Sequence, residues 1–210
     1  MALRLTGEEF IKKILAGERD FKGIILQNFN LSGHELFQEM QNYLKKQDLE
    51  KNPIDLSESQ LNEVIAIGLF LPFVQAERAH LWRADFSKAY LAAGNFKSAF
   101  LLGANFAQAK LRKVNFEKAY LFVAKFSEAY LFEANFTGAI LEEANLEKAD
   151  IKKVNFHETD LRNANLIEVK NLETVLNLAY AKFGNTKVTE KEKEIIEEAL
   201  GERLFYIIKT

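Results

Sequence analysis

ANFAQ AKLRK VNFEK AYLFV AKFSE AYLFE ANFTG, residues 104–138, repeats one pattern every five residues. The third residue of each unit is Phe or Leu, and the residue two positions earlier is Ala or Val. The same phase continues without an insertion over the seventeen units of residues 84–168. A short fixed period of this kind is typical of a solenoid, in which one unit cannot bury its own apolar face and stacked neighbours form the core.

The period of five determines which side chains point inward. It matches neither the helical period of 3.6 nor the strand period of 2, so the chain must turn a corner in every unit. Within an extended unit, side chains alternate, so Ala84 and Phe86 share the inner face while Asp85 points outward. Two inward and three outward residues per unit predict a closed coil with a crowded axis.

Three units carry a specific resemblance. ADFSK (84–88), ANLEK (144–148) and ADIKK (149–153) resemble the A(D/N)LXX motif of the pentapeptide-repeat family. The resemblance implies an all-β solenoid, a right-handed four-sided β-helix with four units per coil, in which residues twenty apart stack. We expect short α-helical caps at both ends of this β-helix and a partly helical insertion within it.

The domain organisation follows from where the repeat phase holds. We expect a capping helix in 1–18, first repeat units in 19–33, a helical insertion in 34–53, the main β-helix in 54–168, and cap helices with an apolar tail in 169–210. A buried helix over 64–73 is the competing interpretation of that apolar run, but Gly68 and Pro72 argue against it.

Both chain ends carry helix signals. Thr6 and Glu9 form a T-x-x-E capping box, and Thr189 with Glu192 forms a second one before a charged helix that ends at Gly201. Between the repeats and that helix, a helical spacing predicts a helix over 170–182 lying across the last coil, through Leu172, Val175, Leu176 and Ala179.

Composition excludes several function classes. The chain has 210 residues, 48% of them hydrophobic, a formal charge of −2 and no cysteine, so neither disulfides nor thiolate metal sites are expected. No secretion signal and no apolar run long enough to span a membrane occur, which predicts a cytoplasmic protein that does not bind membranes. The balanced charge does not favour direct binding of nucleic acid.

The sequence predicts no catalytic, cofactor or metal site. An axis filled by Phe and Leu leaves no concave site for a reaction. His34, His80 and His157 lie far apart, and no nucleotide-binding or metal-binding motif occurs. The Asp and Asn residues that precede the central positions are expected to bind the local backbone, and the Asn series is expected to form a side-chain ladder.

One outer side is predicted to carry apolar residues where polar ones are usual. Stacking by twenty brings together the eight residues that we call the aromatic face: His80, Trp82, Phe100, Leu102, Tyr120, Phe122, Val123 and Ile140. A weaker cluster on the opposite side contains Tyr90, Tyr130 and Phe132, interrupted by Lys110 and Arg112. The aromatic face is either a recognition surface or is covered by 34–53 or by the C-terminal tail.

The tail itself is apolar and strand-prone. It must pack on the body or pair with a second copy in a homodimer, through Leu204, Phe205, Tyr206, Ile207 and Ile208.

The sequence is consistent with two main functions and with a third that it supports less. The first is a protein-interaction scaffold that binds an unidentified protein partner through the aromatic face. The second comes from the family, whose quinolone-resistance members resemble B-form DNA and occupy the DNA-binding surface of gyrase or topoisomerase IV. Such mimicry needs dense negative charge, whereas residues 76–170 hold 12 acidic and 14 basic residues. Direct nucleic-acid binding is the third, through Lys110, Arg112, Lys113 and Lys118 beside Tyr120 and Tyr130.

Overall fold

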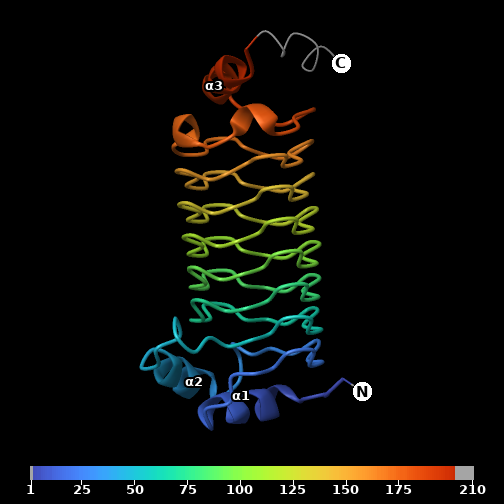
Figure 1. Cartoon of the computed structure of the whole chain (residues 1–210), viewed down its shortest axis with the longest axis vertical. Helices are drawn as coiled ribbons and strands as arrows, with labels where there is room; N and C mark the ends of the chain where they lie inside the picture. Colours follow the sequence, from blue (N-terminus) through green and yellow to red (C-terminus); the bar gives the residue numbers. More distant parts are fainter. Residues whose placement is uncertain (1, 202–210) are drawn as a thin grey trace.

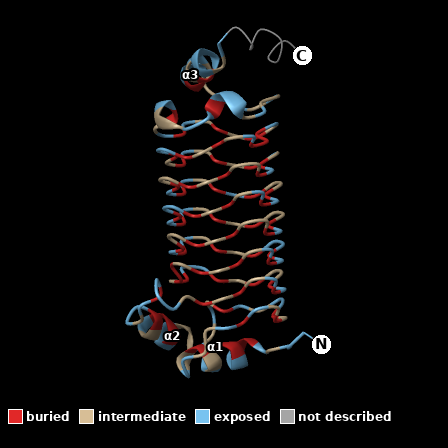
Figure 2. Cartoon of the chain, in the orientation of Figure 1, coloured by how far each residue is buried: buried red, intermediate tan, exposed pale blue. Residues whose placement is uncertain are grey.

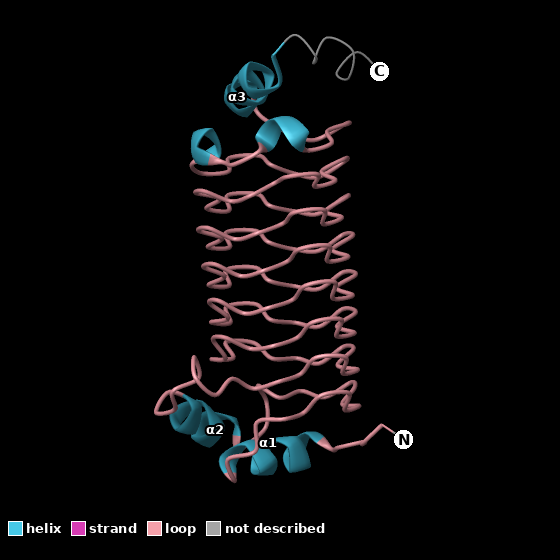
Figure 3. Cartoon of the chain, in the orientation of Figure 1, coloured by secondary structure: helices cyan, strands magenta, loops and turns pink. Residues whose placement is uncertain are grey.

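The chain winds into a four-sided rod, a right-handed β-helix with helices at its ends (Figure 1). The computed structural model describes residues 2–201. Residues twenty apart pair as parallel bridges along each side, as Phe100 does with Tyr120 and Tyr120 with Ile140. Each side therefore pairs through one residue per coil, and no longer strand forms in the described part of the chain (Figure 3).

Tight turns form the corners of the regular coils. In the unit around Phe116, the Ala119 N–H donates to the Phe116 carbonyl at 3.0 Å, and Lys118 between them has a φ of 56°. An i to i+3 hydrogen bond with a positive φ at the third residue defines a type II turn. The same turn recurs through the rod, which explains how a period of five produces a regular square coil.

Phenylalanine rings fill the axis of the rod. Rings one coil apart stack, as Phe106 does on Phe126 at 5.2 Å and 8°, and rings on opposite sides meet edge to face, as Phe116 does with Phe126 at 5.8 Å and 79°. These rings are buried, and the exposed residues line the outside (Figure 2). Near the N-terminal end, Ala66 and Ala76 take the place of Phe, and an apolar cavity of about 40 Å³ remains.

The N-terminal end is closed by α1, Gly7–Leu15. Glu9 N–H donates to Thr6 Oγ1 at 3.2 Å, and Thr6 N–H donates to Glu9 Oε2 at 2.7 Å, which forms the expected capping box. Buried residues of α1 join the core of the rod, and Phe10 meets Phe21 edge to face at 4.8 Å. The helix therefore covers the apolar end of the first coil.

The insertion leaves the coil after the first three units and contains α2, Phe37–Leu44. The units before the insertion pair with the units after it, so their bridges join residues thirty-five apart instead of the usual twenty, as Ile25 joins Gln60. The coil resumes without a shift of register, so the insertion projects from one corner. Residues 64–73 continue the coil, and the alternative of a buried helix there is wrong.

The helix predicted over 170–182 is also wrong. The chain instead makes one more coil containing two short 3₁₀ turns, η1 at Leu172–Thr174 and η2 at Leu178–Tyr180. Leu176 N–H donates to the Val154 carbonyl at 2.8 Å, and the Leu176 carbonyl accepts from Phe156 N–H at 3.1 Å. These bonds satisfy edge groups that a helix lying across the coil would leave unpaired.

The helix α3, Glu190–Leu200, lies over the last coil, and Thr189 caps its N-terminus. Thr189 N–H donates to Glu192 Oε2 at 2.6 Å, and Ile196 is buried against the rod. The expected helical caps at both ends and the partly helical insertion are thus confirmed. The apolar tail, Leu204–Ile208, lies outside the described residues.

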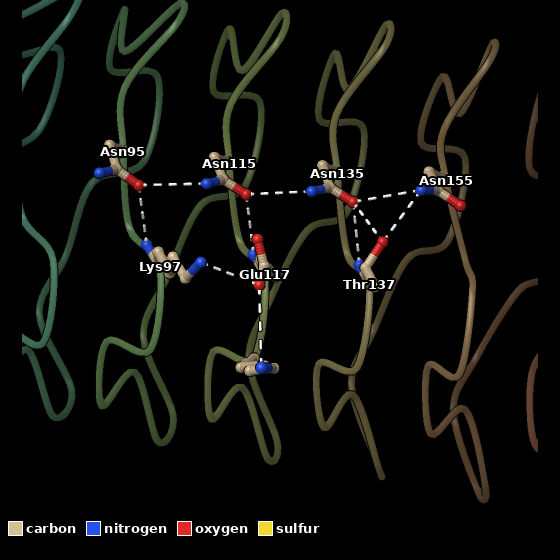
Figure 4. A network of polar contacts seen from close by, with 8 residues as sticks. Asn95, Lys97, Asn115, Glu117, Asn135, Thr137 and Asn155 are labelled. Atoms are coloured by element: carbon tan, nitrogen blue, oxygen red, sulfur yellow. Dashed lines mark hydrogen bonds and ion pairs between the residues drawn. The ribbon is translucent and has the colours of Figure 1, made fainter.

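The predicted asparagine ladder is confirmed (Figure 4). On one side, each amide nitrogen donates to the side-chain oxygen one coil below: Asn115 to Asn95 at 3.2 Å, Asn135 to Asn115 at 3.1 Å and Asn155 to Asn135 at 3.4 Å. The same oxygens accept backbone N–H groups, as Asn115 accepts from Glu117 at 3.1 Å. Each side chain of the ladder must therefore offer an N–H donor to the coil below and an oxygen acceptor to the coil above, and only the first side chain of the ladder needs no donor.

Replacing Asn115 by Asp is expected to lower the free energy of unfolding by about 1–2 kcal/mol, because a carboxylate cannot donate to Asn95 and sets two oxygens face to face. Chemical denaturation measures the loss. Asp85→Asn is the matched control, because Asp85 accepts from Asn105 and lies above Ile65, which needs no donor. An equal loss in both variants would contradict the directional ladder.

Candidate interaction surface

The eight residues of the aromatic face lie together on one side of the rod. His80, Phe100, Tyr120 and Ile140 occupy successive bridge positions, and the rings of His80 and Phe100 stack at 4.6 Å. Phe100 is 47% exposed, and Tyr120 is 38% exposed. Large apolar side chains are thus exposed to solvent at bridge positions that, from residue 75 to residue 165, carry only Asn, Asp, Gln or Lys on two of the other three sides.

The neighbouring column widens this apolar surface. Trp82 is exposed, while Leu102, Phe122 and Val123 are half-buried. The ring of Phe122 lies 6.5 Å from that of Tyr120 and nearly parallel to it, so the two columns form one continuous surface. The coil backbone holds every one of these side chains in place.

Polar groups frame the aromatic face at both ends. Above it, Arg162 Nε donates to Asp160 Oδ1 at 2.9 Å, and the same guanidinium lies 3.6 Å from Glu142. These hydrogen bonds from Arg162 hold the pKa of the Asp160 carboxyl below its usual range. Below the aromatic face, the backbone N–H of Trp82 donates to the side-chain Oδ1 of Asn62 at 2.9 Å. An apolar centre with a polar rim is the usual anatomy of a protein-binding surface.

Val123 adds backbone strain to the aromatic face. It occupies the third position of a type II turn with a φ of 52°, and among the described residues it is the only β-branched residue with a positive φ. The left-handed conformation costs roughly 1–2 kcal/mol in a residue with a Cβ, and branching adds crowding. Strain of this kind is a reason to suspect a functional position.

The insertion does not cover the aromatic face. Gln41 of α2 accepts a hydrogen bond from Phe70 N–H, and Phe70 belongs to the opposite side of the coil. The exposed fractions of Phe100 and Tyr120 are those with the insertion in place. Coverage by 34–53 is therefore excluded, whereas coverage by the tail falls outside the described residues.

The histidine and acidic side chains in the described part of the chain do not form a metal site. No group of three or more His, Asp or Glu side chains within residues 2–201 could hold a metal ion. His157 lies beside Glu158 and the ring of Tyr180, almost four coils of twenty residues along the rod from His80. Among these residues, no helix has the length and apolar character needed to cross a membrane.

Comparison with known proteins assigns the family. Residues 95–127 and 129–166 match the family model for pentapeptide repeats, with eight copies of the repeat. The chain is a pentapeptide-repeat protein. None of the curated proteins matches its sequence significantly.

Several solved structures are similar to parts or most of this pentapeptide-repeat protein. One is QnrB1, a plasmid-mediated fluoroquinolone resistance protein, with 19% identity over 96% of each chain and a TM-score of 0.43. A second is HetL from the cyanobacterium Nostoc, with 19% identity over 86% of this chain and 96% of HetL, and a TM-score of 0.22. A third comes from the Arabidopsis thaliana thylakoid lumen, with 26% identity over 50% of this chain and 72% of that one, and a TM-score of 0.25.

The residues considered for nucleic-acid binding do not form one site in this pentapeptide-repeat protein. Lys110, Arg112 and Lys113 share a side with Tyr130. Lys118 and Tyr120 lie on two other sides, because a unit of five residues moves the chain round one corner. The grouping expected from their closeness in sequence is therefore wrong.

A groove on the side opposite the aromatic face escaped the sequence analysis. It lies between residues 47–50 of the insertion and the units around Leu71, Leu91 and Leu111. Only the folding of the insertion brings these segments together. The adjacent Ala92 and Ala93, two small outward residues in one unit, are the signal in the sequence that marks it.

Proposed function

We propose that this pentapeptide-repeat protein is a non-catalytic interaction scaffold that binds a partner protein through the aromatic face. The observation that carries the proposal is the continuous column of exposed apolar side chains on a rigid coil. Aromatic residues contribute most of the binding energy in protein interfaces, and contiguous apolar patches on soluble proteins mark such interfaces. The strain at Val123 supports the same assignment, since a polar residue or glycine would fold there more easily.

The rigid framework supports the proposal in a second way. Each side chain of the aromatic face comes from a backbone that is hydrogen-bonded to the coils below and above it. Tyr120 N–H donates to the Ala99 carbonyl in the coil below, and Leu121 N–H donates to the Ile140 carbonyl in the coil above. Little backbone entropy is lost when a partner binds such a surface, so more of the apolar contact energy is left for affinity. A second copy of this chain would gain from the same preorganisation, and a homodimer through the tail stays a prediction.

Replacing Trp82, Phe100 and Phe122 together by Ser tests the proposal. We expect the triple variant to lose at least about tenfold in capture of the partner, because each aromatic anchor contributes about 1–2 kcal/mol. Quantitative mass spectrometry of pull-downs from the source cells measures the loss. The matched control replaces Ile67, Leu176 and Tyr180 by Ser, because these exposed apolar residues lie outside the aromatic face. Equal capture by the wild type and the aromatic-face variant would contradict the proposal.

The charge of the rod argues against the alternative of topoisomerase inhibition by DNA mimicry. Acidic and basic residues nearly balance over 76–170, and a DNA-binding groove selects dense negative charge. We expect supercoiling by DNA gyrase to be unchanged by micromolar amounts of the protein. Inhibition of supercoiling, or protection of gyrase from a quinolone, would favour that alternative over the scaffold.

A further inference from the structure

The groove opposite the aromatic face has a volume of about 610 Å³. Its floor is made by two units of the coil, in which Ala92 and Ala93 are small while Pro72 and Phe73 below them are bulky. Its wall is the end of the insertion, which is anchored by the buried Leu49. A volume of this size suits a few side chains of a bound segment.

Phe73 adds a conformational cost to the groove. It has a φ of 61°, and it is the only aromatic residue with a positive φ in the described part of the chain. Phe73 is half-buried against the core, and the ring of its neighbour Phe70 stacks on Tyr90 at 5.2 Å. The apolar floor is therefore kept at the expense of local backbone strain.

The charges around the groove are separated. Arg112 and Lys113 line it on the coil side, and Asp48 and Glu50 line it on the insertion side. Over the four units of this side between residues 109 and 173, basic residues outnumber acidic ones by six to three: Lys110, Arg112, Lys113, Lys152, Lys153 and Lys170 against Glu133, Asp150 and Glu173. Glu133 pairs with Lys113 at 3.5 Å. Counted from the groove onward, this side of the rod is therefore basic.

We propose that this groove binds an extended segment of a partner protein in which an apolar side chain is followed by acidic residues. The apolar side chain lies over Ala92 and Ala93. The carboxylates contact Arg112, compete with Glu133 for the Lys113 ammonium, and continue toward Lys152. This binding site is independent of the aromatic face, because the two surfaces lie on opposite sides of the rod.

Charge and ring geometry favour an acidic peptide over a single-stranded nucleic acid. Bases bind to proteins by stacking on free ring faces, whereas the rings of Phe70 and Tyr90 stack on each other. The Arg112 guanidinium covers the ring of Phe132, at 5.6 Å from its centroid. Asp48 and Glu50 would repel phosphates at the insertion side. A peptide with carboxylates at one end only can place them beside Arg112 and Lys113 and away from Asp48 and Glu50.

Selection from a phage library of random twelve-residue peptides on the full-length protein tests the proposal. We expect enrichment of peptides with an aromatic or aliphatic residue beside acidic residues. A synthetic peptide of the consensus, labelled with fluorescein, is then titrated by anisotropy. We expect Ala92→Trp, which fills the groove from an outward position, and Arg112→Glu each to weaken binding at least about tenfold.

Matched controls are available on another side of the coil. Ala107→Trp occupies the same turn position as Ala92→Trp, and Lys88→Glu removes an exposed cation, so both are expected to stay within twofold of the wild type. Circular dichroism confirms that each variant is folded. The proposal is overturned if no peptide is enriched, if the consensus lacks carboxylates, if Ala92→Trp binds like the wild type, or if a dT oligonucleotide of twelve residues displaces the peptide.

Discussion

Phe116→Ala is expected to lower the free energy of unfolding by about 4 kcal/mol. Phe116 is fully buried and lies between Phe96 and Phe136, with ring centroids at 5.4 and 5.1 Å, and beside Phe106 and Phe126 on the facing side. Each coil fixes the spacing of the next, so the surrounding rings cannot collapse into the cavity. Urea denaturation followed by far-ultraviolet circular dichroism measures the change.

Two further variants serve as controls for the effect of Phe116→Ala. Phe116→Leu keeps most of the volume, and leucine already fills the alternate sides of the same coil, so we expect a loss of only about 1 kcal/mol. Phe132→Ala removes an equal ring from the outer surface and is expected to cost less than about 1 kcal/mol. A Phe116→Ala variant as stable as Phe132→Ala would show that the inner rings do not support the rod.

Ile11→Asp is expected to cost about 5 kcal/mol, because it removes a fully buried side chain and places a charge without a partner against the apolar end of the first coil. Ile11 lies on α1 between Phe10 and Ile14, which belong to the same core. Displacement of α1 would uncover the edge of the coil at Phe21. We therefore expect self-association as well as a lower melting temperature.

Lys12→Asp is the control for the cap, because it introduces the same group one residue away on the exposed side of α1. Sedimentation velocity and thermal denaturation compare the two variants. We expect Lys12→Asp to stay in the oligomeric state of the wild type, while Ile11→Asp forms larger species. Equal behaviour of both variants would contradict the role of α1 as a cap.

The coil could be predicted from the sequence because its information is local and repeated. The pattern of apolar residues in each unit indicates which residues point inward. Stacking of residues twenty apart then places Phe100 above His80 and Tyr120 above Phe100. For the same reason the repeat pattern alone was enough to predict which residues make up the aromatic face. The capping boxes at Thr6 and Thr189 are likewise local, since each depends on one residue three positions away.

The rest depends on contacts that a pattern does not encode. The spacing of Leu172 and Leu176 fits a helix as well as a coil. The coil forms because the unpaired backbone groups at Val154 and Phe156 can hydrogen-bond to Leu176. The groove requires the insertion to fold against one particular side, which is set by the buried Leu49 and the Gln41 bond to Phe70. The strain at Val123 follows from its turn position, and only the backbone geometry reveals it.

A crystal structure of the full-length protein tests the central claim most directly, that the axis is closed and only the outer sides can bind other molecules. We predict continuous density for the stacked rings from Phe86 to Phe136, without ordered solvent between them, and solvent-exposed rings at Phe100 and Tyr120. Rings turned outward from the axis, or a channel that holds solvent or a ligand, would contradict the account.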